Sequence, residues 1–482
     1  MMTLILLVLP LLGLASLFLL KGDAIKKAAF AFSLIAFLAA ISAWVQFDPS
    51  KLNQFDLNLP WVASLGISFH VGMDGLSILL VLLTTFLTPL IILSTFEREY
   101  KNPLAFYGLI LLMEVGLIGV FVAKDAFLFY IFWELGLIPI YFISLLWGGE
   151  NAKAITVKFF IYTLAGSLLM LFGLFYLYTQ TPGTHSFSIE AFYNLHLDAS
   201  TQGWLFWCLF AAFAIKIPVF PFHTWQPSTY HMNSTPGTML LSGIMLKMGI
   251  FGILRWLLPV VPVGCEEYGT VAIFLAMIGI VYASVIAIIQ KDFKKLLAYS
   301  SIAHVGLITA GVFSGNVDGI RGGILQMLAH GVNVVGLFFI ADIIFNRTKT
   351  YDMASLGGIR NKAPWFATLF MIIMLGAVAL PLTNGFVGEF LLIKGVFDAN
   401  AVVAAISGLT VILGAVYMLL AYQKIALGET NKLTAEFTDL TTNEKAVLIP
   451  IALVVIITGI FPKPLFDLVE PSVKSILTVI GK

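Results

Sequence analysis

The chain has 482 residues, of which 60% are hydrophobic and only 11% are charged. This composition excludes an ordinary soluble globular protein and indicates a membrane protein. The formal net charge of +1 provides no general attraction to nucleic acid. The two cysteines, Cys208 and Cys265, are too few for an iron–sulfur cluster or a thiolate metal site, and no nucleotide-binding motif is present. We therefore expect no redox cofactor and no metal in this chain.

Apolar runs of about 20 residues, long enough to span a bilayer, recur along almost the whole chain. They predict an all-α polytopic membrane protein with about fourteen transmembrane helices. The first run has no basic residues before it, so we expect a retained helix rather than a cleaved signal peptide. The runs lie near residues 2–20, 27–46, 74–95, 103–123, 125–147, 156–178, 203–222, 236–258, 268–290, 296–314, 318–345, 364–396, 401–426 and 445–462.

Lysine and arginine are more frequent in the loops on one side of this predicted bundle, as at Lys21, Lys294 and Lys295. Because basic loops remain in the cytoplasm, both termini are predicted on the periplasmic side of a bacterial inner membrane. The segments 47–73 and 179–202 are then the longest polar connections on the outer side.

Two runs contain prolines that interrupt a helix, because proline lacks a backbone donor and clashes with the preceding turn. Helix 7 is expected to break at Pro218 and Pro221, and helix 12 at Pro381. Broken helices at corresponding positions of two halves indicate a transport site. The breaks are five helices apart, which predicts two inverted five-helix repeats, helices 4–8 and 9–13. The predicted parts are helices 1–3 (1–102), the first repeat (103–258), the second repeat (268–426), and helix 14 with a tail (427–482).

Ionisable residues lie inside several runs, where a charge is costly and usually functional. Lys216 stands beside the first break, and Lys247 lies in the middle of run 8. Glu114 and Glu134 are each ten residues from Lys124 at the turn between their runs. At 1.5 Å per residue both carboxylates are about 15 Å deep, near the midplane. The other candidates are Lys158 in run 6, His304 and His330 in runs 10 and 11, and Glu389 after the second break.

These groups suit a proton path. Desolvation disfavours the charged form of a lysine or a glutamate, and a partner of opposite charge restores it. A glutamate that approaches or leaves a lysine can thus switch the proton that the lysine holds, and histidines pass protons near neutral pH. Structural alternatives remain open: a static ion pair for Glu134 and Lys216, hydrogen-bonded core histidines, and a snorkelling side chain for Lys158. Glu114 has a similar alternative.

Four motifs together resemble the antiporter-like subunits of respiratory complex I over nearly the whole chain. That family has a fourteen-helix core with inverted five-helix repeats and broken helices 7 and 12. Within it the chain is closest to the M type. Glu389 stands where the L and N types typically have a lysine, and the chain has no room for the long lateral helix of the L type. The motifs are FWELGLIPIYF at 132–142, AIKIPVFPFHTWQP at 214–227, KKLLAYSSIAHVG at 294–306 and GFVGEF at 385–390.

The resemblance implies a proton-translocating subunit of NADH:quinone oxidoreductase that has no redox centre of its own. FMN, iron–sulfur clusters and quinone would belong to partner subunits. The partners would be L- and N-type and small membrane subunits, and through them the peripheral redox arm. It also implies that Glu134 and Lys216 form the pair of one half-channel, that Lys247, His304 and His330 form the central connection, and that Glu389 ends the second half-channel.

One departure from the family concerns the break in helix 12. The family usually has Leu-Pro-Gly there, whereas this chain has Leu380-Pro381-Leu382. The main alternative function is a subunit of a multi-subunit Na⁺/H⁺ antiporter or of a membrane-bound hydrogenase, which would use the same helices. A structural membrane spacer and a quinone-binding redox enzyme are further alternatives.

Overall fold

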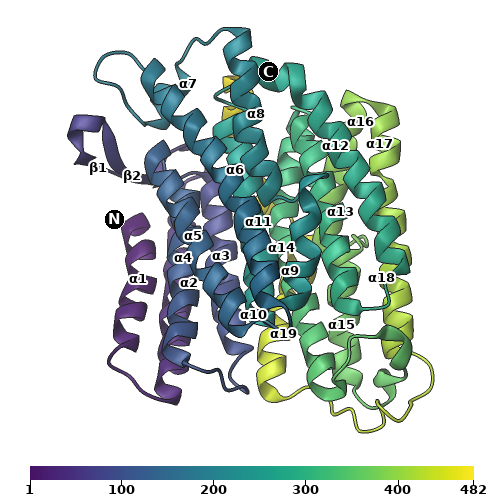
Figure 1. Ribbon diagram of the computed structural model, residues 1–482. Coiled ribbons are helices and arrows are strands. Elements are labelled where there is room, and N and C mark those ends of the chain that lie inside the picture. The colour runs from purple at the N-terminus through teal and green to yellow at the C-terminus, as the bar shows by residue number, and fades with distance from the viewer. Residues whose placement is uncertain (482) are drawn as a thin grey trace.

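The computed structural model describes residues 1–481, and long helices dominate it (Figure 1). The N-terminal helices stand at one edge of the bundle, and a two-stranded antiparallel hairpin projects beside them. Thr3 Oγ1 donates to the Phe55 carbonyl (2.6 Å), so the chain start lies against this hairpin. This part comprises α1 (Met2–Leu17), α2 (Asp23–Val45), β1 (Gln54–Val62), β2 (Ile67–Met73) and α3 (Gly75–Leu93).

The part predicted as the first repeat contains one broken helix and one irregular helix. α8 stops at Lys216, and the chain continues through a 3-10 turn into the short helix α9. The next helix contains two π-helical turns, at Leu241–Met245 and Ile253–Leu257. Its elements are α4 (Pro103–Val122), α5 (Ala126–Trp147), α6 (Ala152–Gln180), α7 (Ile189–Tyr193), α8 (Ala199–Lys216), α9 (Gln226–Met232), α10 (Thr235–Leu240) and α11 (Leu246–Gly252).

The part predicted as the second repeat packs around a long central helix, α14, and contains the second break, between α15 and α16. The last two helices follow it and return to the hairpin end of the bundle, where the Leu76 amide donates to Ser472 Oγ (3.3 Å). These elements are α12 (Pro262–Ile289), α13 (Phe293–Phe313), α14 (Val317–Thr348), α15 (Pro364–Ala377), α16 (Asn384–Ala399), α17 (Ala401–Ser407), α18 (Leu409–Ala426), α19 (Thr442–Ile460) and α20 (Lys463–Val479).

The structure confirms an all-α polytopic membrane fold. Eleven helices of the described chain are long and apolar enough to cross a membrane, and Met2–Leu17 and Pro364–Ala377 are shorter apolar helices. Every predicted run coincides with a helix or a broken helix, and both predicted breaks occur. The total of fourteen spans, the inversion of the repeats and the part boundaries remain predictions. The start of α1 and the helix α20 both lie toward the hairpin end, and the side of the membrane that this end faces also remains a prediction.

The part predicted as helix 14 with a tail (427–482) contains a further helix after helix 14. Residues Lys463–Val479 form the helix α20. Leu468, Val469, Val473 and Ile476 recur at helical spacing and are buried, while charged residues occupy the opposite face. The segment is too polar for a membrane span. Its amphipathic periodicity indicates a helix, but a search for continuous apolar runs does not detect this pattern.

Carboxylates at helix N-termini fix several turns between helices. Asp125 accepts hydrogen bonds from the amides of Phe127 and Leu128 (both 3.0 Å), and Asp292 accepts one from Lys295 (2.8 Å). Such caps satisfy amides that have no partner within the helix. Glycines then allow close helix packing: a Cβ on Gly116 of α4 would lie 2.8 Å from the Gly136 nitrogen of α5.

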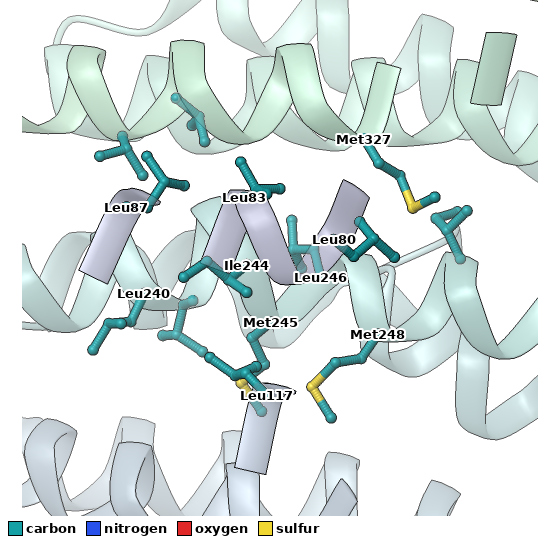
Figure 2. Packing of buried hydrophobic residues seen from close by; sticks show 14 of the residues in the cluster. Leu80, Leu83, Leu87, Leu117, Leu240, Ile244, Met245, Leu246, Met248 and Met327 are labelled. Carbon is teal, nitrogen blue, oxygen red and sulfur yellow. The ribbon is translucent and has the colours of Figure 1, made fainter. Parts of the chain in front are cut away.

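Apolar side chains fill the centre of the bundle around α10 and α11 (Figure 2). Residues of α3 interdigitate there with residues of α4, α14 and the π-helical turn. The helix that carries Lys247 is therefore held on several sides by close packing, which fixes the position of its side chain. The labelled residues are Leu80, Leu83, Leu87, Leu117, Leu240, Ile244, Met245, Leu246, Met248 and Met327.

Candidate functional site

The first polar group of the interior is the pair of Glu134 and Lys216. Lys216 is the last residue of α8 and is 2% exposed, and its Nζ lies 4.9 Å from the centroid of the Trp133 ring. Glu134 is close enough for electrostatic attraction. Within residues 1–481, however, neither Lys216 Nζ nor Glu134 Oε1 makes a hydrogen bond. Among the described residues, Lys216 and Glu134 thus influence each other electrostatically without forming a hydrogen-bonded ion pair.

The break beside Lys216 is stabilised by hydrogen bonds that replace helical ones. The Val219 amide donates to the Ala214 carbonyl (2.8 Å), and Trp225 Nε1 donates to the Ile215 carbonyl (2.9 Å). Pro218 lacks the amide that would continue the helix. The carbonyls of the last helical turn therefore find partners inside the protein, as a membrane interior requires.

The second break separates α15 from α16 and contains Pro381. Ala379 and Leu382 have φ values of +59° and +75° there. This left-handed conformation is one that glycine adopts easily and leucine rarely. The Leu-Pro-Leu departure therefore leaves the break in place, and Leu382 bears the backbone strain.

Lys247 lies at the centre of the interior and is 2% exposed. Its Nζ donates to the Ser242 carbonyl (2.5 Å) and lies 2.9 Å from His330 Nδ1. This acceptor carbonyl belongs to the π-helical turn Leu241–Met245. Such π-turns often mark functional positions.

A line of polar side chains, with one gap between His330 and His304, leads from Lys247 to Glu389. His330 Nε2 lies 3.1 Å from Ser301 Oγ, and the rings of His330 and His304 are 6.3 Å apart between centroids. His304 Nδ1 lies 2.7 Å from Glu389 Oε1. The segments that carry these residues, α11, α13, α14 and α16, are distant in sequence and meet only in the fold.

A small cavity of about 20 Å³ lies between the two histidines. Its polar lining includes Ser300, Ser301, His304, Gln326 and His330. A cavity of this size with several polar partners accommodates about one water molecule. The widest step of the chain, from His330 to His304, is therefore bridgeable by hydrogen bonds.

The structure places Glu114 and Lys158 apart from this chain. Glu114 is fully buried, and neither of its oxygens has a hydrogen-bond partner in the described part of the chain. Lys158 Nζ donates to the Thr224 carbonyl (3.0 Å) and lies over the Tyr162 ring. Lys158 thus connects α6 to the turn after the first break.

Ser301 and Gln326 belong to the polar chain but were not predicted. Gln326 Nε2 donates to Glu389 Oε1 (3.0 Å), and Ser301 contacts His330. The available signal is spacing, because Ser301 precedes His304 by three residues and Gln326 precedes His330 by four. Residues at these spacings share one face of a helix.

A second ionic cluster holds the hairpin to the turn between α4 and α5. Lys124 Nζ donates to Asp56 Oδ1 (3.0 Å), and His70 Nε2 lies 3.1 Å from the same oxygen. Partial burial raises the pKa of Asp56, but Lys124 and His70 outweigh it, so the pKa lies below its ordinary value.

Comparison with known proteins identifies the family. Residues 123–461 match the family described as NADH:quinone oxidoreductase/Mrp antiporter, TM. NADH-quinone oxidoreductase subunit M from Rickettsia conorii is 41% identical over 449 residues, which cover 92% of this chain and 90% of that protein. The chain belongs to the antiporter-like subunits of NADH:quinone oxidoreductase. The predicted resemblance, including the M type, is thereby confirmed.

Other members of the family agree with this assignment. NADH-ubiquinone oxidoreductase chain 4 from Marchantia polymorpha is 35% identical over 92% of this chain and 90% of that protein. A structure of respiratory complex I from Thermus thermophilus with bound NADH contains a chain with 31% identity and a TM-score of 0.93, covering 100% of both chains. A chain of the Mrp complex from Dietzia sp. DQ12-45-1b shares the fold (TM-score 0.87, 99% and 98% coverage) at only 20% identity.

Proposed function

We propose that this antiporter-like subunit carries protons through the membrane along the chain Lys247–His330–His304–Glu389, and that Glu134 and Lys216 switch the access of protons to it. The observation that supports this most strongly is the contact of Lys247 with His330, 2.9 Å apart and 83 residues apart in sequence. Buried ionisable groups are costly in a membrane and persist where they serve transport.

The arrangement favours switching at one end and relay at the other. Glu134 and Lys216 attract each other but form no hydrogen bond in the described chain, so a movement that brings them into contact would strengthen their attraction. His304 and Glu389 are in direct contact, which suits proton transfer between them. Moving one proton against 100 mV requires about 2.3 kcal/mol, which is within the range of one such charge rearrangement.

We further propose that protons enter from the side of the basic loops, which is the cytoplasm, and leave on the hairpin side. The energy would come from quinone reduction in partner subunits that hold FMN and iron–sulfur clusters. L- and N-type membrane subunits would be neighbours. Within residues 1–481, no group of three or more His, Cys, Asp or Glu residues could hold a metal ion.

The antiporter alternative has weaker support, since the similarity to the Mrp complex is one of fold alone at 20% identity.

The test of the proposal is Lys216→Met in the intact enzyme reconstituted into vesicles, with proton translocation and NADH oxidation measured together. We expect fewer protons per NADH, or slower turnover if coupling is tight. Lys424→Met, which alters an exposed lysine of α18, is the control. An unchanged proton-to-NADH ratio and rate in Lys216→Met would support the spacer function instead.

A further inference from the structure

The two buried lysines of the candidate site have different surroundings. Lys247 Nζ has two polar partners, the Ser242 carbonyl and His330 Nδ1. Lys216 Nζ makes no hydrogen bond to any residue that the structure describes, and it lies over the Trp133 ring, 4.9 Å from the ring centroid. A buried ammonium is costly unless other groups replace its hydration. The aromatic face of Trp133 is therefore the close group that the structure offers to the charge of Lys216.

A tryptophan face suits this task. The face of an aromatic ring carries negative potential and attracts a cation within about 6 Å of its centroid, and tryptophan does so most strongly. Trp133 and Lys216 are each 2% exposed, so little water screens the attraction between them. A ring face also imposes no hydrogen-bond direction, in contrast to a carbonyl or a carboxylate. An ammonium held in this way can leave without breaking a hydrogen bond.

The Trp133 ring is held in place by other aromatic rings. Its centroid lies 5.7 Å from that of Phe129 on the same helix and 5.7 Å from that of Phe213 on α8. Phe213 precedes Lys216 by three residues and shares its face of α8. Gly252 of α11 makes room for this arrangement, because a Cβ there would clash with the Phe213 ring. The packing of α5, α8 and α11 thus sets the position of the ring beside Lys216.

Trp133 and Glu134 are neighbours on α5 and offer Lys216 two different partners. Consecutive residues of a helix point about 100° apart, so the ring and the carboxylate approach the lysine from different directions. Glu134 attracts Lys216, but its Oε1 makes no hydrogen bond among the described residues. Lysine has a flexible four-carbon side chain. A change in its conformation can therefore move the ammonium between the ring and the carboxylate while the helices stay in place.

We propose that Trp133 is a positioning residue of the switch, and that its ring face holds the Lys216 ammonium while the lysine is apart from Glu134. The inference rests on the proposed function, in which Glu134 and Lys216 control the access of protons. The indole nitrogen of tryptophan is a donor only and cannot take up a proton from the lysine. Trp133 thus competes with Glu134 for the positive charge of Lys216 but not for its proton.

The proposal is testable with fluorinated tryptophans placed at position 133 by suppression of a stop codon, in the intact enzyme in vesicles. Fluorine withdraws electron density from the ring face and changes the shape of the ring little. Coupled turnover is measured as proton translocation together with NADH oxidation. We expect it to fall stepwise as fluorine atoms are added, by about tenfold for the most fluorinated ring. A residue that only fills space would show no such series.

Trp256 is the matched control for the fluorinated series. It is 1% exposed and its ring also packs on Phe129, 5.0 Å away between centroids. The neighbouring Arg255 lies over the Phe251 ring instead. Fluorination of Trp256 should therefore leave coupled turnover unchanged. Equal turnover of the most fluorinated Trp133 enzyme and the enzyme with ordinary tryptophan would overturn the proposal, and so would an equal loss at position 256.

A pair of ordinary variants gives a second test. Trp133→Phe keeps a ring with a weaker face and Trp133→Leu keeps only apolar volume, so we expect phenylalanine to preserve more coupled turnover than leucine. Equal loss in the two assembled enzymes would contradict a role for the ring face. If Lys216→Met loses pumping while fluorination of Trp133 has no effect, the proposed function stands and the role of Trp133 is wrong. If Lys216→Met pumps normally, the proposed function itself is wrong.

Discussion

Gly459 of α19 sets the position of the second break, and its substitution gives a quantitative prediction. A Cβ at this position would lie 2.3 Å from the carbonyl carbon of Thr383 and 2.5 Å from the Leu382 oxygen. Both are backbone atoms, so no side-chain rotation relieves the clash. Either α19 or the turn before α16 must move by about 1 Å, because protein interiors are close-packed.

The expected consequences of Gly459→Ala follow from this shift. Overpacking of this kind costs about 1–3 kcal/mol of stability. Because α16 begins directly after Thr383, the shift also moves Glu389 relative to His304, which lies 2.7 Å away. A misplacement of about 1 Å can reduce the rate of a positioned reaction about 100-fold. We therefore expect a lower thermal dissociation temperature and a strong loss of proton translocation.

The assay is scanning fluorimetry of the purified enzyme together with proton pumping in vesicles. Gly414→Ala in α18 is the matched control, since its Cβ would meet only the end of the Tyr417 side chain, with the hydroxyl at 3.5 Å, an ordinary contact. Both changes gain about 1 kcal/mol of helix propensity, which cancels in the comparison. Equal stability and equal pumping in the two variants would refute the proposed coupling between α19 and Glu389.

Three further predictions concern the turns and the outer surface. Leu382→Gly should leave stability unchanged or raise it by up to about 1 kcal/mol, because it relieves the positive φ of an exposed leucine; a marked destabilisation in thermal unfolding would contradict the strain. Because the pKa of Asp56 is lowered, its ion pair with Lys124 should stabilise the hairpin at pH values above the ordinary pKa of 3.8. This stabilisation should be lost as the pH falls through the lower folded-state pKa. Proteolysis of the hairpin in the wild type should then be faster in acid than at neutral pH. In Asp56→Asn it should already be faster than in the wild type at neutral pH. Glu470→Ala should expose α20 to proteolysis by breaking its ion pair with Arg321 of α14, and unchanged cleavage would show that apolar contacts alone hold α20.

Proline effects are local, and for this reason the sequence predicted both helix breaks. Pro218 and Pro381 prevent helix continuation whatever surrounds them. The burial of Lys216 and Lys247 was equally predictable, because each lies within an apolar run. The direct contact between Lys247 and His330 was not, since it depends on the packing of α11 against α14.

Neutral polar residues were harder to recognise than charged ones. Serine and threonine inside helices often bond only their own backbone, as Thr84 does with the Leu80 carbonyl. Only its spacing of three residues from His304 distinguishes Ser301, which contacts His330, from such residues in the sequence. Buried atoms without a hydrogen-bond partner among residues 1–481, such as Gln226 Oε1 and the Tyr230 hydroxyl, can be recognised only in the folded structure.

The central claim is that Lys247 and His330 belong to one proton path, and the most direct measurement is proton translocation per NADH in the intact Lys247→Met enzyme. Methionine keeps the length of the side chain but cannot hold a proton, so the contact at 2.9 Å with His330 is lost. The account predicts a lower proton-to-NADH ratio, or arrested turnover if coupling is tight. A normal ratio at a normal rate of NADH oxidation, in an enzyme assembled as the wild type, would contradict the account.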